Sequence, residues 1–248
     1  MKKILNLIAG LTALGMVSSQ SATTYVGNGN SSFGGAIGNG SLEVTDNASG
    51  NLNFTFTKGG SDFNNALVLY FDTTSGGVNN TSGLTDTADG LRRAISGFDS
   101  ALGRSALTFA TGFNADFAIA LNGGFAGLWN LSNSADFSFA TSANLLRSGG
   151  TTNINASTYS FSLNVTDLGL AANSGQNFNF FATYISESAY RSGETFGASY
   201  SDSPAPGWNP FTAAGSNSYT LVPEPSSSLL MGLGLAGLAV LRRIRKNA

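Results

Sequence analysis

The 248-residue chain contains no cysteine and no histidine. Without these side chains the sequence cannot form a Ser-His-Asp triad, a Cys-His pair, or the nitrogen and sulfur ligand sets that hold zinc and haem. Charged residues are also scarce, because Asp, Glu, Lys and Arg together make up only 10% of the chain, against roughly 25% in an average globular protein. The absence of histidine and cysteine excludes the enzyme classes that depend on such triads, pairs and metal sites.

Positive charge is rarest in the middle of the chain. Half of the twelve basic residues lie at the two ends, namely Lys2, Lys3, Arg242, Arg243, Arg245 and Lys246. Residues 23–222 contain six basic and thirteen acidic residues, which gives this region a net charge of −7. Because binding to a nucleic-acid backbone requires clustered Lys and Arg, this balance argues against nucleic acid as a partner.

The residue types that stand in place of charges indicate a folded domain with an uncharged polar surface. Glycine is abundant at 32 residues, and Asn, Ser and Thr fill most of the other polar positions. The 18 phenylalanines supply apolar surface for a core. A disordered chain would have few aromatic residues and a high net charge, which is the opposite of this composition.

The first 22 residues have the three parts of a secretory signal peptide. Two lysines are followed by an apolar stretch over residues 4–17, and then by small residues. We expect residues 1–22 to direct the chain through the secretory translocon and to be removed by signal peptidase after Ser19, Ser21 or Ala22. The alternative is an uncleaved N-terminal anchor, but the apolar stretch is short for a hydrocarbon core of ~30 Å.

The C-terminal end has the features of a membrane-spanning segment. Residues 229–241 contain no polar side chain, and Arg242 and Arg243 follow at once. As a helix, the segment from residue 226 into the basic cluster is about 28 Å long, enough to cross a bilayer. We expect a transmembrane helix over residues 226–241 and a basic tail over residues 242–248, which the positive-inside rule places in the cytoplasm. The central region then lies across the membrane from both chain ends.

A short proline-containing motif precedes this segment and reads Val222, Pro223, Glu224, Pro225. Two prolines around one glutamate keep the backbone extended. Together with the Gly- and Leu-rich helix and the final arginines, the motif resembles the PEP-CTERM sorting signal. This resemblance is confined to residues 222–248 together with the N-terminal signal peptide. It implies that Pro223, Glu224 and Pro225 are recognised by an exosortase, a membrane enzyme that processes the tail.

The same resemblance implies a stop signal, a route and a destination. Arg242 and Arg243 would act as the stop signal. The chain would pass through an intermediate held in the inner membrane by its C-terminal helix, and then reach the outer surface or the extracellular space. Such tails are typical of Gram-negative bacteria that make extracellular polysaccharide, which makes this polysaccharide a candidate partner.

The central region, residues 23–221, has the alternation of apolar and polar residues typical of β-strands, interrupted by glycine-rich turns. The strongest strand patterns lie at residues 52–57, 66–71, 115–121, 159–166 and 178–185. The second and third of these alternate less and are more continuously apolar, as expected of strands buried on both faces. Only residues 85–98 have helical spacing, with Thr85 as a cap. We predict an all-β domain, an antiparallel β-sandwich of jelly-roll type with one short helix.

Three kinds of site remain open without histidine and cysteine, and the first two are a metal site and a catalytic site. Calcium prefers oxygen ligands and could bind Asp72, Asp86 and Asp89, although their spacing does not match an EF-hand loop. The simpler interpretation is that these side chains bond to their own backbone in turns. A glycoside hydrolase would need two carboxylates about 5–9 Å apart, and no motif selects such a pair. We therefore expect no enzyme, and no cofactor apart from calcium.

Carbohydrate binding is the third kind of site that the sequence leaves open. Trp129, Trp208, Tyr190 and Tyr200 fall in predicted loops or strand ends, with amide and charged side chains beside several of them. Aromatic faces of this kind can stack on sugar rings, while neighbouring amides bond to the hydroxyl groups. The alternative is that these rings are ordinary core or edge aromatics, since tryptophan buries a large area wherever it lies.

Taken together, these features predict an exported structural or adhesive protein of the cell surface or extracellular matrix. Two alternatives stay open. One is a carbohydrate-binding module that recognises exopolysaccharide, and the other is a hydrolase that acts on matrix glycans.

Overall fold

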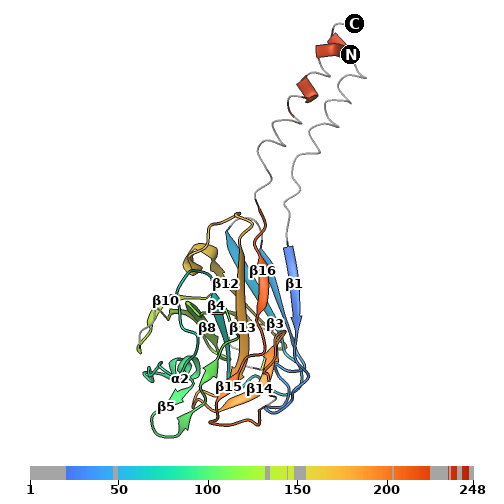
Figure 1. Cartoon of the computed structure of the whole chain (residues 1–248). Helices are drawn as coiled ribbons and strands as arrows, with labels where there is room; N and C mark the ends of the chain where they lie inside the picture. The colour runs from blue at the N-terminus through green and yellow to red at the C-terminus, as the bar shows by residue number, and fades with distance from the viewer. Residues whose placement is uncertain are drawn as a thin grey trace.

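The computed structural model describes most of the chain between the two predicted membrane-directed ends (Figure 1). The described residues are 21–46, 50–131, 135–143, 145–147, 155–202, 204–223, 234, 236–238 and 242–245. Most of the predicted signal peptide and of the predicted transmembrane helix, together with Glu224 and Pro225, lies outside them. None of the helices formed by the described residues is long and apolar enough to span a membrane.

A five-stranded antiparallel sheet forms one layer of the domain. Its strands, in spatial order, are β1 (Ser21–Val26), β2 (Ser41–Asp46), β3 (Asn51–Thr57), β12 (Thr158–Asn164) and β11 (Leu146–Arg147). The first three follow one another as a meander, and β12 then pairs with β3 in register. Side chains of β3 alternate between buried and more exposed, as the apolar–polar pattern predicts.

A larger antiparallel sheet of seven strands forms the second layer. Its spatial order is β10 (Ser138–Ser142), β9 (Ala126–Asn130), β8 (Phe117–Leu121), β4 (Ala66–Asp72), β13 (Asn177–Ile185) and β14 (Arg191–Phe196), with β16 (Asn217–Thr220) also paired to β13. The described residues also form two small two-stranded pairs, β5 (Phe98–Asp99) with β6 (Gly103–Arg104), and β7 (Leu107–Thr108) with β15 (Phe211–Thr212). The prediction of an all-β antiparallel sandwich is confirmed.

Strand β4 connects two hydrophobic cores, because its side chains alternate between them. Leu69 and Phe71 enter the core between the two sheets, where Phe54 of β3 packs edge-on against Phe71. Val68 and Tyr70 point to the other face and enter a second core. All side chains from Ala66 to Phe71 are buried. The continuous apolar run therefore reflects burial on both faces, as predicted.

The helix that covers the second core is shorter than predicted and begins at a different cap. It is α2 (Gly90–Ser96), and the carboxylate of Asp89 caps it by accepting a hydrogen bond from the N–H of Arg92. The prediction of Thr85 as the cap was wrong, because the helix begins only at Gly90, directly after Asp89, and Thr85 lies in the preceding loop. The sequence alone does not show which residue caps a helix when several Thr and Asp residues precede its first apolar position.

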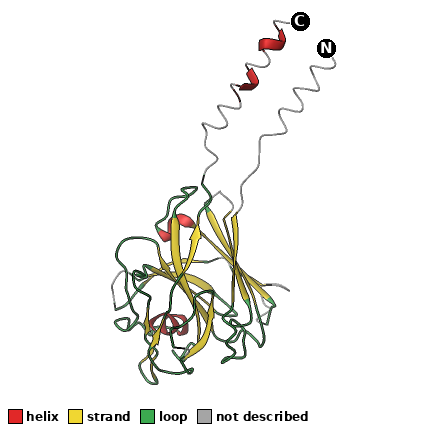
Figure 2. Cartoon of the chain, turned by 45° about the vertical axis from the view of Figure 1, so that its right-hand side comes forward, coloured by secondary structure: helices red, strands yellow, loops and turns green. Residues whose placement is uncertain are grey.

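Strand β12 also ends earlier than its alternation predicts. The chain turns at Asn164 into a short 3₁₀ helix, η1 (Val165–Leu168). Asn164 and Asp167 form a reciprocal capping box, which competes with continuation of the strand. The helices α2 and η1 lie near opposite ends of the sandwich (Figure 2).

The first and last strands of the domain meet at one end of the sandwich. The hydroxyl of Tyr219 in β16 donates to the carbonyl of Ser21 at 2.9 Å, and that of Tyr25 in β1 donates to the carbonyl of Ser218 at 2.6 Å. β1 begins and β16 ends at this same end (Figure 1). Among the three predicted cleavage positions, only a cut after Ser19 leaves all of β1 attached to the domain.

Candidate functional site

The proline motif begins where the folded domain ends. The N–H of Val222 donates to the Oδ2 atom of Asp46 at 2.8 Å, and both residues are almost completely buried. Leu221, the residue before Val222, donates its N–H to the carbonyl of Gln176. Pro223 is exposed. The fold therefore fixes the first residue of the motif and leaves the next one accessible.

Residues 221–246 match the family of the PEP-CTERM protein-sorting motif. The chain carries a PEP-CTERM sorting tail. The matched range contains all the residues predicted to direct sorting, and of these Arg242 and Arg243 lie exposed in a helical turn. A PEP-CTERM tail marks an exported protein that an exosortase processes at the membrane. No curated protein matches the chain in sequence.

Trp129 does not offer its face to a ligand, contrary to the sequence-based expectation. It lies within strand β9, between β8 and β10, with only 3% of its surface exposed. Its indole packs against Phe139 at a centroid distance of 5.6 Å and against Phe125 at 6.5 Å. The exposed rings here are Phe125 and Phe139, which the sequence did not distinguish from core residues.

Tyr190 and Trp208 do come together, as a pair of candidate sugar-binding residues should. Their ring centroids are 4.9 Å apart in a T-shaped arrangement, and Trp208 is 39% exposed. The indole N–H of Trp208 donates to the carbonyl of Ser188, and the hydroxyl of Tyr190 donates to that of Pro206. A side chain at Gly103 would lie about 3.0 Å from the indole, so one part of Trp208 packs against the Gly103 backbone. The pair is thus held in a fixed geometry at the surface.

The predicted calcium ligands do not converge. Asp86 and Asp89 both pair with the guanidinium of Arg92, and Asp89 also caps α2. Burial raises the pKa of Asp72. A hydrogen bond with the Asn114 backbone lowers this pKa, whereas the neighbouring charge of Asp116 raises it. No three acidic side chains in the described ranges gather into a group that could hold a metal ion. The turn-bonding alternative accounts for Asp86 and Asp89.

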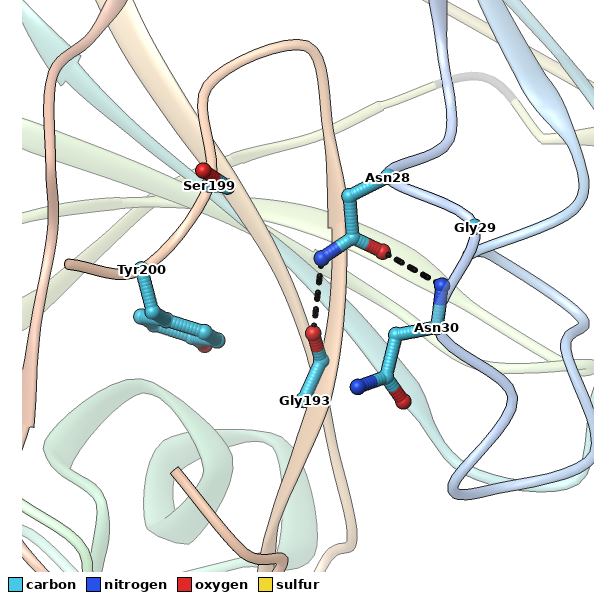
Figure 3. Close-up of a pocket in the computed structure, with 6 residues that line it drawn as sticks. All are labelled: Asn28, Gly29, Asn30, Gly193, Ser199 and Tyr200. Carbon is cyan, nitrogen blue, oxygen red and sulfur yellow. Dashed lines mark hydrogen bonds between the residues drawn. The ribbon is translucent and has the colours of Figure 1, made fainter. Parts of the chain in front are cut away.

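A polar pocket of about 370 Å³ lies between the turn after β1 and strand β14 (Figure 3). Six residues line it: Asn28, Gly29, Asn30, Gly193, Ser199 and Tyr200. The amide of Asn28 donates to the carbonyl of Gly193 at 2.8 Å, and its oxygen accepts from the N–H of Asn30 at 3.1 Å. These bonds fix the turn against the strand. From the sequence, this Gly- and Asn-rich stretch cannot be told from an ordinary turn.

Tyr200 forms one wall of this pocket and is otherwise buried. Only 5% of its surface is exposed, and its hydroxyl bonds to the Oγ1 atom of Thr183. Burial raises the pKa of Tyr200, an effect that the nearby positive charge of Arg191 opposes. Of the four predicted sugar-binding residues, Tyr200 alone reaches the pocket, and it contributes its ring because its hydroxyl is already bonded.

A buried carboxylate supports the loop that carries the turn. Glu194 of β14 is completely buried, and its two oxygens accept hydrogen bonds from the N–H groups of Phe33, Gly35, Ile37 and Gly38, at 2.6 to 3.2 Å. Hydrogen bonds to a charged group are the stronger kind in proteins. This cradle ties the loop after β1 to β14, and therefore positions the pocket.

Arg191 supports the same region from the other face of β14. Its guanidinium is completely buried, donates to the carbonyl of Ser105 and to the hydroxyl of Thr183, and forms none of the ion pairs found among the described residues. It lies next to Gly97, at the C-terminal end of α2, where a helix favours positive charge. Nothing in the local sequence indicates that this arginine is buried.

Proposed function

We propose that the chain is a non-catalytic component of the cell surface or extracellular matrix, delivered there through its PEP-CTERM tail. The observation that carries this proposal is the position of the tail. Both ends of the chain leave the sandwich at the same side, where Tyr219 contacts Ser21. The other end and the sides are thereby free for contacts away from the membrane. Export of the chain across the membrane would require the secretory translocon and signal peptidase.

The use of the acidic side chains supports a structural role over catalysis. Glu194 accepts bonds from a loop, and Asp116 accepts them from the N–H groups of two successive threonines. Glu187 accepts from the amide of Asn122 at 2.7 Å, and Asp167 closes a cap. A hydrolase acting on matrix glycans would instead need two carboxylates with free access to substrate.

The exported chain should therefore co-sediment with the organism's extracellular polysaccharide and be released when that polysaccharide is enzymatically depolymerised. The control is an unrelated reporter domain that carries the same two chain ends. Retention of the reporter to the same extent would mean that the tail, and not the domain, makes the contact. Release of reducing sugar ends by the intact chain would favour the hydrolase alternative and contradict the proposal.

Carbohydrate binding is the second candidate function, and the exposed pair of Trp208 and Tyr190 favours it. An indole that is 39% exposed and held at both its N–H and its ring is a preorganised stacking platform. Replacing Trp208 with Ala should weaken retention on the polysaccharide about tenfold, a change of ~1.4 kcal/mol. Affinity electrophoresis in gels containing the polysaccharide would measure it. The matched control is Trp129→Phe, since Trp129 is buried; equal losses in both variants would point to misfolding.

A further inference from the structure

The polar pocket has the size of a site for one small ring. Its volume of about 370 Å³ lies near the lower end of the range of about 300–1,000 Å³ found for ligand pockets. Glycine at two of the six lining positions keeps it open. A Cβ atom at Gly193 would lie 2.5 Å from the amide nitrogen of Asn30, so any larger residue there would displace Asn30 or fill the space.

Several polar groups in the pocket have unused hydrogen-bonding capacity. The Nδ2 group of Asn30 makes no hydrogen bond within the described part of the chain, while its oxygen accepts from Ser32. It lies beside Gly193 in the pocket (Figure 3). Ser199 is exposed, and its hydroxyl also lacks a partner among the described residues. The oxygen of Asn28 accepts one bond and can accept a second.

The chemistry of the lining selects for neutral ligands. None of the six residues carries a charge. A charged ligand would lose hydration on entering without gaining a counter-charge, whereas hydroxyl groups can exchange water for amide and hydroxyl partners. The ring of Tyr200 adds an apolar wall. Amide donors, hydroxyls and one aromatic ring are the combination that suits a polyhydroxylated ring.

The pocket lies at the end of β1 away from the tail. Strand β1 begins at Ser21, beside Tyr219, and the turn that carries Asn28 follows its last residue. Seven residues of extended chain separate these points by about 23 Å. A ligand in the pocket would therefore meet the protein on the side remote from the membrane end.

We propose that this pocket binds a single neutral sugar residue of an extracellular polysaccharide. The proposal rests on the proposed surface or matrix function and gives it a ligand class. It is independent of the platform formed by Trp208 and Tyr190, neither of which lines the pocket. The preformed bonds of Asn28 mean that little ordering is needed on binding.

The test is a titration of the full chain, purified in detergent, with the methyl glycosides of glucose, galactose and mannose. Glucuronate serves as a charged probe of the same ring size. Two-dimensional NMR would follow the side-chain amide of Asn30, whose signals should shift with at least one neutral glycoside. Asn30→Ala should weaken that binding about tenfold, the effect of a lost hydrogen bond. Gly193→Ala should abolish it by filling the pocket.

Two controls separate this site from the rest of the molecule. Asn64→Ala removes an exposed asparagine that does not line the pocket, and Trp208→Ala removes the aromatic platform; both should bind the glycosides normally. Absence of any shift at Asn30 with all three glycosides would overturn the proposal, as would equal binding of glucuronate. Failure of the chain to associate with the matrix in cells, with glycoside binding intact, would instead contradict only the proposed function.

Discussion

Deleting residues 224–248 should abolish delivery of the protein to the cell surface or extracellular space. The deleted residues include most of the PEP-CTERM tail, which is the part of the chain that an exosortase processes. The deletion should start at residue 224, because Val222 is buried and bonded to Asp46 and its loss would disturb the fold itself. Fractionation of cells followed by immunodetection would measure the outcome.

A point substitution sharpens this test. Glu224→Ala leaves the apolar segment and the arginines in place, so the variant should accumulate as a full-length species in the membrane fraction. Ser227→Ala, also within the tail but outside the proline motif, is the matched control and should be processed normally. Normal surface display of the chain lacking residues 224–248 would contradict the role assigned to the tail.

Replacing Glu194 with Ala should destabilise the domain more than any other single substitution considered. The change leaves four backbone N–H groups without their acceptor, and three of these hydrogen bonds are buried. Each unsatisfied buried donor costs about 1–3 kcal/mol before relaxation. We expect a loss of about 3–5 kcal/mol in the free energy of unfolding, comparable to breaking a buried ion pair. For a domain of this size the melting temperature should fall by roughly 10 °C.

The matched control for this substitution is Glu187→Ala. Glu187 is only partly buried and accepts a single side-chain bond, from Asn122, so its loss should cost about 1 kcal/mol or less. Thermal unfolding followed by circular dichroism compares the two variants directly. Similar melting temperatures for Glu194→Ala and the unchanged protein would mean that the loop over residues 33–38 does not depend on the carboxylate.

The sequence predicted those elements whose pattern is local. The alternation in β3 and the continuous apolar run in β4 depend only on which face of a strand is buried, and both were predicted from a few consecutive residues. The tail could be recognised for a similar reason, since its three parts follow one another along the chain. By contrast, the short strand β14 carries Arg191 and Glu194, whose charges gave no indication of burial.

The pocket could not be predicted because its two sides are far apart in the sequence. Asn28 bonds to a residue 165 positions away, and the bonds between Glu194 and its loop span 156 to 161 positions. The two tryptophans show the same difficulty. Trp129 and Trp208 have similar polar neighbours in the sequence, yet packing in the second core buries the first, while the second is exposed in a loop.

The attachment of the tail to β16 determines how the domain would bear mechanical force. A protein held at the membrane by this end experiences drag from the moving fluid and from any polymer bound to it. The pull would enter through Pro223 and run along β16, whose four residue pairs with β13 lie side by side in antiparallel register. Force in this direction shears the ladder, so its hydrogen bonds resist together rather than opening one after another. The bond from Val222 to Asp46, at the point of entry, would be loaded first.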